Sequence, residues 1–331
     1  MFLFLTGMAL VIVVFVDALW TTLWVNGGGG PVSARVAAAV WWGLRRSTTE
    51  TRPWPLTLAG PVVLVVVVLG WVGLLWVGWT LVFSSDPAAV AYTGTGDSPD
   101  WAGRFYFAGF TLFTLGMGNI VPDRGVWEVA TVIASGSGML LITLSISYVI
   151  SVLGAVVAGR AFAVSVAGLG GDAEEIVCRA WDGERFSGLT LALSTLSSRL
   201  DTITQQHLTY PVLHFYHSRH VEAAPTSAVA ILDEALTVLR FGVPPSCRPP
   251  ETVIEGARSS VENYLSTLKG ARLEPADRLP RPPSLDRLRA LGFPTVSNEA
   301  FAHDLESLDE RRRALLGMLE ADARTWPPEQ E

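Results

Sequence analysis

The chain has 331 residues, of which 50% are hydrophobic and 17% charged, and its formal net charge is −7. Residues 1–159 contain only six Arg and seven acidic residues, whereas the remainder carries 18 basic and 24 acidic residues. This distribution excludes a single soluble domain and a basic nucleic-acid-binding protein, and it predicts a membrane-embedded first half followed by a soluble second half.

The first apolar stretch is Phe2–Val25, which is interrupted only by Asp17. About 20 apolar residues suffice to cross a bilayer as a helix. We expect a spanning helix here and not a signal peptide, because a positively charged start and a small-residue cleavage site are not evident. Asp17 has two open interpretations: a functional acid within the membrane, or a carboxylate that reaches the interface or pairs with an arginine such as Arg35.

A loop rich in arginine, Asn26–Pro55, separates this span from a second one, Leu56–Phe83, which contains no charge. The positive-inside rule places this loop in the cytoplasm and the N-terminus outside. Within the loop, Ser33–Arg46 is predicted to form an amphipathic helix at the membrane surface. Residues 1–55 are therefore expected to be an N-terminal membrane segment of a multi-pass protein, in a cell membrane of prokaryotic type.

The next loop, Ser84–Gly125, is expected outside and contains a short apolar segment, Phe105–Phe113. Since a helix rises about 1.5 Å per residue, this segment is too short to span, but it suits a half-helix that enters the membrane and stops. Backbone that ends at membrane depth must be buried in protein or line a water-filled cavity. The sequence that follows is Thr114-Leu115-Gly116-Met117-Gly118-Asn119-Ile120-Val121-Pro122.

Glycine at alternate positions of this sequence permits positive φ angles, so that successive carbonyls can face one axis and replace the water around a cation. The sequence resembles the T-V-G-Y-G-D signature of the potassium channel pore-domain superfamily, and the resemblance covers roughly residues 56–158 in the order helix, half-helix, filter, helix. It implies a homotetramer in the membrane lipid, because each chain supplies one filter strand, and potassium ions as the bound species, with no organic cofactor. The implied ion-binding residues are Thr114, Leu115, Gly116, Met117 and Gly118, with Asn119 at the outer mouth.

Four residues depart from the family pattern. Met117 stands where relatives often have Tyr, Phe or Leu, and Asn119 stands where Asp is usual. Phe107 and Phe110 occupy half-helix positions where some relatives carry a Trp and a Glu that hydrogen-bond behind the filter. We therefore expect a filter supported by aromatic packing. The leading hypothesis is a potassium-selective channel, and two alternatives remain open: a weakly selective cation channel, and a non-conducting membrane signalling or scaffold protein.

Two activities lack the residues that they need. A voltage sensor requires several arginines on a spanning helix, and the spans carry none. No nucleophile beside a general base stands out, so we expect no enzyme.

The third apolar stretch, Val126–Val157, carries hydroxyls at Thr143, Ser147 and Ser151. A spacing of i, i+4 and i+8 places all three on one helical face. Such a face suits a helix that lines a hydrated cavity, although hydroxyls within membranes also hydrogen-bond inside or between helices. Both interpretations remain open.

Gly136 and Gly138, in the same stretch, lie where relatives place a gating hinge. Close packing of helices at small residues explains them equally well. Residues 56–159 together form the predicted pore domain.

Residues 160–331 are predicted to form a helical cytoplasmic domain that regulates or assembles the pore, which makes the expected fold class all-α with three membrane spans. A short segment, Gly159–Asp172, is expected to tether this domain to the third span. Its ligand cannot be named from the sequence, which lacks a dinucleotide fingerprint and a P-loop. The predicted helices are Ala173–Ala180, Phe186–Tyr210, Ala228–Phe241, Glu251–Leu268, Ser284–Leu291 and Asn298–Ala323.

Four of the five histidines fall close together in the soluble half, at His207, His214, His217 and His220. Imidazole changes charge near neutral pH and binds transition metals, so one interpretation is a metal site or a pH sensor. The other is packing of imidazole and aromatic rings, since Pro211 interrupts any common helical face.

Overall fold

The computed structural model describes residues 1–24, 28–47, 57–116, 118–218, 220–270, 274–322 and 324–326. The chain divides into two compact units. The first unit contains Met1–Leu153 together with Thr209–Tyr216, and the second contains Gly154–Leu208 together with His217–Glu331. The chain therefore leaves the second unit after Leu208, enters the first, and returns at His217.

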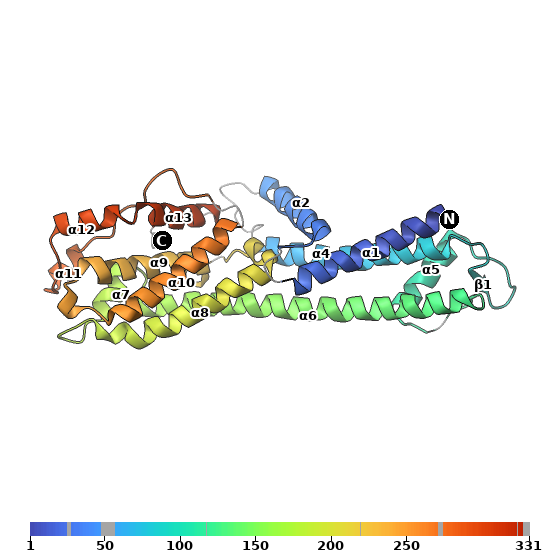
Figure 1. The fold of residues 1–331 in the computed structure, drawn as a ribbon, viewed down its shortest axis with the longest axis horizontal. Helices are drawn as coiled ribbons and strands as arrows, with labels where there is room; N and C mark the ends of the chain where they lie inside the picture. The colour runs from blue at the N-terminus through green and yellow to red at the C-terminus, as the bar shows by residue number, and fades with distance from the viewer. Residues whose placement is uncertain are drawn as a thin grey trace. The chain divides into compact units, whose positions relative to one another are not determined.

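The first unit is mostly helical (Figure 1). Three of them, α1, α4 and α6, are long and apolar enough to cross a membrane, which confirms the three predicted spans. The predicted surface helix and the predicted half-helix are also present, as α2 and α5. The bounds are α1 Phe2–Leu23, α2 Pro31–Ser47, α4 Ala59–Phe83, α5 Trp101–Leu112 and α6 Val126–Leu169.

Helix α6 extends beyond Val157, where the third span was predicted to end, and continues to Leu169. The reason is that its later residues have a second partner: Phe162, Ala163 and Val166 are buried in the core of the second unit. Most of the predicted tether is therefore helical, and only residues 170–172 separate α6 from α7.

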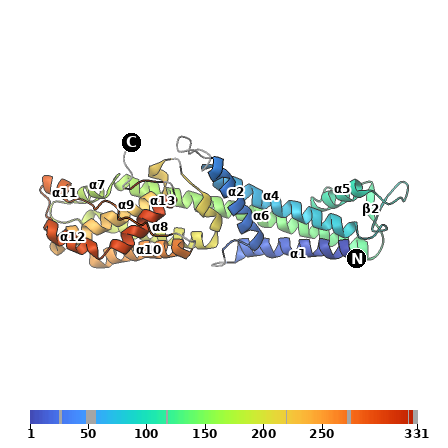
Figure 2. The same ribbon diagram turned by 90° about the horizontal axis from the view of Figure 1, so that it is seen from above.

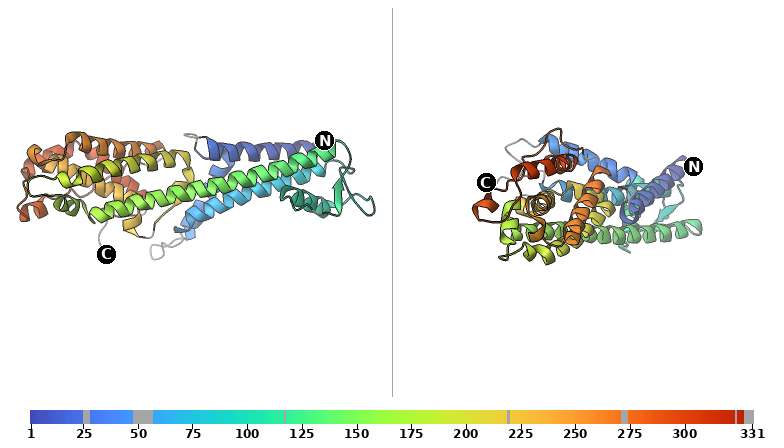
Figure 3. Two further views of the ribbon diagram at one scale, coloured as in Figure 1. Left: turned by 90° about the horizontal axis from the view of Figure 1, so that it is seen from below. Right: turned by 60° about the vertical axis from the view of Figure 1, so that its left-hand side comes forward.

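Helices α1 and α4 approach closely, and Figure 2 shows them side by side. The small size of Gly7 allows this approach, because a Cβ atom there would lie 2.6 Å from the carbonyl oxygen of Gly78. Small residues at helix interfaces are typical of membranes, where association depends on close packing. Figure 3 shows α4 running beside α6, and the indole of Trp79 donates a 2.9 Å hydrogen bond to Ser137 Oγ between these helices.

A two-stranded antiparallel sheet, β1 Val90–Tyr92 with β2 Ile120–Pro122, pairs Val90 with Pro122 and Tyr92 with Ile120. The sequence pattern does not predict this sheet. Three residues are too few to show an alternating pattern, and the partner strands lie on opposite sides of the half-helix in the sequence.

The second unit packs its helices around α9, which contacts α7, α10 and α13. The helix predicted at Asn298–Ala323 is two helices, because the chain turns at Ser307 and Leu308. The α-helices are α7 Ala173–Arg179, α8 Thr190–Thr209, α9 Pro225–Thr237, α10 Glu251–Gly270, α11 Asp286–Ala290, α12 Asn298–Glu306 and α13 Asp309–Ala321. The shorter helical turns are η1 Ser187–Leu189, η2 Pro211–Phe215, η3 Val221–Ala223, η4 Val238–Gly242 (a π-helix) and η5 Pro245–Cys247.

Candidate functional site

The half-helix α5 begins at a side-chain cap, and a residue with left-handed backbone follows two residues after its last residue, Leu112. The Asp100 carboxylate accepts a 2.8 Å hydrogen bond from Gly103 N, which satisfies one of the free amides of the first turn. After α5, Thr114 has a φ of 52°. This conformation is uncommon outside glycine and cannot continue the helix. The helix therefore presents its carbonyl end, which carries partial negative charge, next to the candidate filter.

Arg104 anchors α5 to the preceding loop, a role that was not predicted from the sequence. Its side chain is buried, and its guanidinium donates only to oxygens of the chain between the end of α4 and the start of α5. A lone arginine in an otherwise apolar half-helix was the available signal. Its acceptors are the carbonyls of Phe83, Asp86 (2.9 Å), Pro87 (2.9 Å) and Pro99 (3.1 Å), and Ser98 Oγ (2.7 Å).

The candidate filter turns left-handed at alternate residues, because Thr114 has a φ of 52° and Gly116 a φ of 71°. Met117 lies outside the described residues. At Gly118 the need for glycine is also steric, since a Cβ atom would lie 2.4 Å from the Phe110 ring. The described residues from Thr114 to Asn119 are exposed in the single chain, with Leu115 66% exposed. Their role in ion binding remains a prediction.

The outer end of this segment is attached to the small sheet. The carbonyl oxygen of Asn119 accepts a 2.9 Å hydrogen bond from Thr93 N, directly after β1. Ile120 then begins β2. The two ends of the segment, at α5 and at β2, are therefore both held by secondary structure.

Aromatic rings support the segment from behind. The buried Phe107 ring lies 5.2 Å from Phe110 and 4.9 Å from Phe83 between ring centroids, both edge to face. The Trp76 ring stacks on Phe105 at 4.3 Å and donates a 2.8 Å hydrogen bond to the Phe105 carbonyl. Edge-to-face and offset pairs are the favoured aromatic geometries. Phe110 also packs on Gly118, as expected for a filter supported by packing.

The three hydroxyls of α6 are all exposed in the single chain. Two of them already donate within the helix, Thr143 Oγ1 to the Met139 carbonyl (2.8 Å) and Ser151 Oγ to the Ser147 carbonyl (2.9 Å). A hydroxyl that donates in this way still has lone pairs that can accept or contact a cation. Cavity lining by Thr143, Ser147 and Ser151 therefore remains a prediction.

The two candidate hinge glycines differ. A Cβ atom on Gly138 would lie 2.3 Å from the carbonyl oxygen of Leu112, so this position needs glycine for close approach to the end of α5. A Cβ atom on Gly136 would meet nothing within 4 Å in the single chain. The structure thus supplies a packing reason for Gly138, while a hinge role stays a prediction for both.

Asp17 is buried and joins three helices of the first unit. Its carboxylate accepts from the amides of Val32 (2.7 Å) and Ser33 (3.2 Å), which are the first-turn amides of α2, and from the Trp71 indole (2.8 Å) and the Ser33 hydroxyl. A carboxylate at a helix N-terminus is stabilised by the free amides and the helix dipole. Arg35, the predicted partner, donates instead to the Pro31 carbonyl. The geometry favours a structural role for Asp17.

The histidine segment is distributed over different surroundings. His207 is half-buried and packs edge to face against Tyr264, with the ring centroids 5.5 Å apart. Its Nδ1 lies 3.0 Å from the Ile203 carbonyl oxygen. His214 lines a cavity of about 170 Å³ in the first unit. His217 pairs with Asp322, and His220 precedes η3.

These placements bear on the two interpretations of the segment. In the part of the chain that the structure describes, no three His, Cys, Asp or Glu side chains converge as metal ligands. Burial lowers the pKa of His207, which disfavours its charged form. Burial raises the pKa of Asp322, but hydrogen bonds from His217 and Thr226 outweigh this effect and hold that pKa below its usual value. The contacts of His207 and His217 are those of packed, hydrogen-bonded side chains, which favours the packing interpretation for these two residues.

The segment Thr209–Tyr216 packs against helices of the first unit. Its Phe215 ring lies 5.7 Å from Trp41 of α2, and its Tyr210 ring lies 6.0 Å from Tyr148 of α6. A Cβ atom on Gly60 of α4 would lie 2.4 Å from the Tyr216 ring. One short segment thus touches three helices of the membrane-spanning unit.

Comparison with known proteins places these features in context. Residues 62–155 match a protein family described as ion channel. Over 327 residues, the chain is 40% identical to the protein named "Uncharacterized membrane protein YdjJ" of Bacillus subtilis (strain 168), and the alignment covers 99% of this chain and 96% of that protein. No solved structure gives a significant match.

Proposed function

We propose that this chain forms a potassium-selective channel, because its residues 62–155 match an ion-channel family and because it belongs to the same family as YdjJ, with which it aligns over 99% of its length. The observation that carries the proposal is the left-handed backbone at Thr114 and Gly116, directly beyond the carbonyl end of a half-helix. Alternating handedness turns successive carbonyls toward one side, where they can replace the hydration shell of a cation.

The same geometry supports an assembly of several copies, and we propose a tetramer. One chain contributes one filter segment, and a ring of carbonyls requires several such segments around an axis. The filter residues and the hydroxyl face of α6 are exposed in the single chain, which suits surfaces that face a shared pore. Native mass spectrometry in detergent should therefore show four copies.

Conduction is testable in liposomes that contain the purified full-length chain and a potassium gradient. We expect potassium flux that greatly exceeds sodium flux and that barium blocks, because barium fits the same carbonyl sites. Equal potassium and sodium fluxes would favour the weakly selective channel, which the aromatic support of the filter also permits. The absence of any thallium flux from correctly assembled protein would favour the non-conducting alternative.

Orientation is the second testable part of the proposal. We propose that α2 lies on the cytoplasmic side and that the loop between β1 and α5 lies outside, since arginines gather around α2. In a chain whose Cys178 and Cys247 are replaced by serine, Thr95→Cys should react with an impermeant thiol reagent applied to intact cells. Gly43→Cys, at an exposed position of α2, should react only after the cells are opened. The opposite labelling pattern would reverse the orientation.

A further inference from the structure

Arg104 lies near the start of α5 and is only 7% exposed. A guanidinium has five N–H groups, and this one donates five hydrogen bonds, one from Nε, two from Nη1 and two from Nη2. The acceptors are the carbonyls of Phe83, Asp86, Pro87 and Pro99 and the hydroxyl of Ser98. The number of donors therefore equals the number of acceptors, and none of the acceptors carries a net charge.

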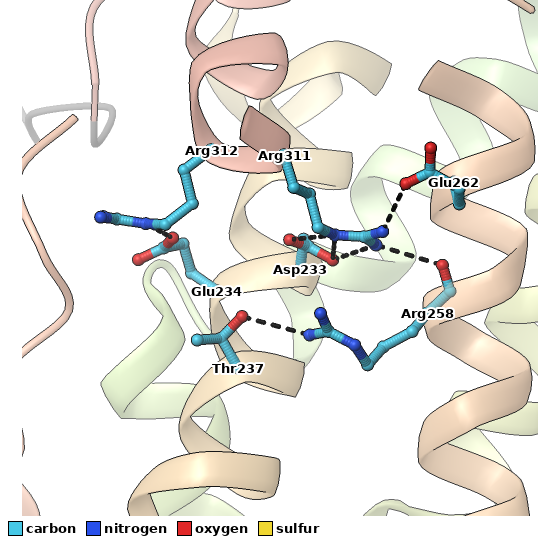
Figure 4. Close-up of polar contacts among 7 residues, drawn as sticks. All are labelled: Asp233, Glu234, Thr237, Arg258, Glu262, Arg311 and Arg312. Atoms are coloured by element: carbon cyan, nitrogen blue, oxygen red, sulfur yellow. Dashed lines mark hydrogen bonds and ion pairs between the residues drawn. The ribbon is translucent and has the colours of Figure 1, made fainter. Parts of the chain in front are cut away.

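The arginines that join α9 to α13 in the second unit are held differently, because each has a carboxylate partner (Figure 4). Arg311 pairs with Asp233 at 2.6 Å, and the buried Arg312 pairs with Glu234 at 3.2 Å. Burying a charge without an ionic partner is costly, and neutral acceptors offset this cost only when they are correctly placed. The guanidinium of Arg104 and the oxygens around it therefore fix one another's positions.

These hydrogen bonds close the loop that carries β1. Pro87 precedes β1 and Ser98 follows it, and both donate or accept at the same place: Ser98 Oγ donates a 2.6 Å hydrogen bond to the Pro87 carbonyl, and Arg104 Nη2 donates to both residues. Arg104 thus joins the two sides of the loop and connects both of them to α5.

The closed loop in turn holds both ends of β2, the strand that follows the candidate filter. The Asp86 carbonyl, which accepts from the guanidinium, also accepts a 3.1 Å hydrogen bond from Ala89 N, and the Ala89 carbonyl accepts a 3.0 Å bond from Asp123 N, directly after β2. At the other end of β2, Thr93 N donates a 2.9 Å bond to the carbonyl of Asn119. Hydrogen bonds therefore lead from the guanidinium to the outer end of the filter segment.

We propose that Arg104 is a positioning residue that sets the outer end of the candidate filter and, through it, the preference for potassium. The inference deepens the proposed function and rests on it, since selectivity depends on how carbonyls are arranged around the ion. Lysine at this position would keep the charge but would offer three donors from one nitrogen, so at least two of the five acceptors would lose their partner. Arg104→Lys therefore tests the geometry of the guanidinium separately from its charge.

Hydrogen–deuterium exchange of the purified full-length chain tests the positioning without any ion flux. Arg104→Lys should speed the exchange of the Thr93 amide at least about fivefold, the factor that corresponds to one lost hydrogen bond. Arg124→Lys, at an exposed position just after β2, is the matched control and should exchange as the wild type does.

Ser98→Ala provides a second variant, because it removes one acceptor at an exposed position and should fold even if Arg104→Lys does not. It should speed the exchange of the Thr93 amide in the same direction and by a smaller factor. Wild-type exchange at Thr93 in both variants would overturn the proposal.

Flux into liposomes distinguishes a positioning role from a purely structural one. Loss of stability lowers the number of working channels, so it reduces potassium and sodium fluxes equally and leaves the sensitivity to barium unchanged. Displaced filter carbonyls should instead lower the ratio of potassium to sodium flux severalfold and raise the barium concentration that halves the flux. We expect this second pattern for Arg104→Lys and the wild-type pattern for Arg124→Lys.

The two proposals fail separately. Faster exchange at Thr93 together with a wild-type flux ratio and wild-type barium sensitivity would leave Arg104 a structural role alone and contradict the inference. A wild-type chain that passes no ions would refute the channel, whereas exchange at Thr93 would still decide whether Arg104 holds the outer end of the segment.

Discussion

Replacing Gly116 by alanine is expected to reduce potassium flux at least tenfold without preventing assembly. Gly116 has a φ of 71°, and an alanine Cβ there would meet no atom closer than the Thr114 carbonyl oxygen at 4.0 Å. The substitution therefore acts through the backbone and not through a clash. A side chain in the left-handed region costs about 1–2 kcal/mol, and the segment can avoid this cost by rotating its carbonyls away from the pore axis. Flux into liposomes measures the loss.

Gly96→Ala is the matched control for Gly116→Ala. Gly96 also has a left-handed φ, 76°, with nothing within 4 Å of its added Cβ, but it lies in the loop after β1. Both substitutions place an alanine in the left-handed region and should cost a similar free energy. A difference in potassium flux between them therefore reports the role of Gly116 in the filter. Native mass spectrometry should show the same oligomer for both. Normal potassium flux through Gly116→Ala would refute the assignment of the filter.

Replacing Gly60 by alanine is expected to displace the segment Thr209–Tyr216 and to lower the thermal stability of the first unit. The added Cβ would lie 2.4 Å from the Tyr216 ring, and overpacking of this kind costs about 1–3 kcal/mol. We further propose that the second unit gates or assembles the pore through this segment and through α6, which run between the two units in the sequence. The substitution should therefore change potassium flux severalfold while the ratio of potassium to sodium flux stays constant.

A double-mutant cycle isolates this contact. Tyr216→Ala removes the ring that the new methyl group would strike, so Gly60→Ala should have little further effect in the Tyr216→Ala background. Gly73→Ala, on the same helix but with nothing within 4 Å of its Cβ, should behave as the wild type. Additive effects of Gly60→Ala and Tyr216→Ala on stability would show that the segment does not dock on α4 as described. Unchanged flux in both variants would refute the gating role alone.

Much of the helical structure was predictable because its signals are local. The apolar stretches of α1 and α4 end within a few residues of their predicted limits, and the half-helix was recognisable from its length and its aromatic residues. In the second unit, prolines and helical spacing located most helices. Predictions were less accurate where a helix end depends on a distant partner, as for α6, whose last turns are buried against the second unit's core.

The sequence by itself determined the three spans and the position of the candidate filter. A bilayer requires continuous apolar helices, and a carbonyl-lined turn requires glycine, so both leave their pattern in neighbouring residues. Only the tertiary structure decided that Asp17 caps α2, that Arg104 anchors α5, and that Thr209–Tyr216 joins the first unit. The physical reason is that each of these depends on which donors, acceptors and rings lie close in space. That proximity is set by contacts between residues far apart in the chain, which composition and periodicity do not encode.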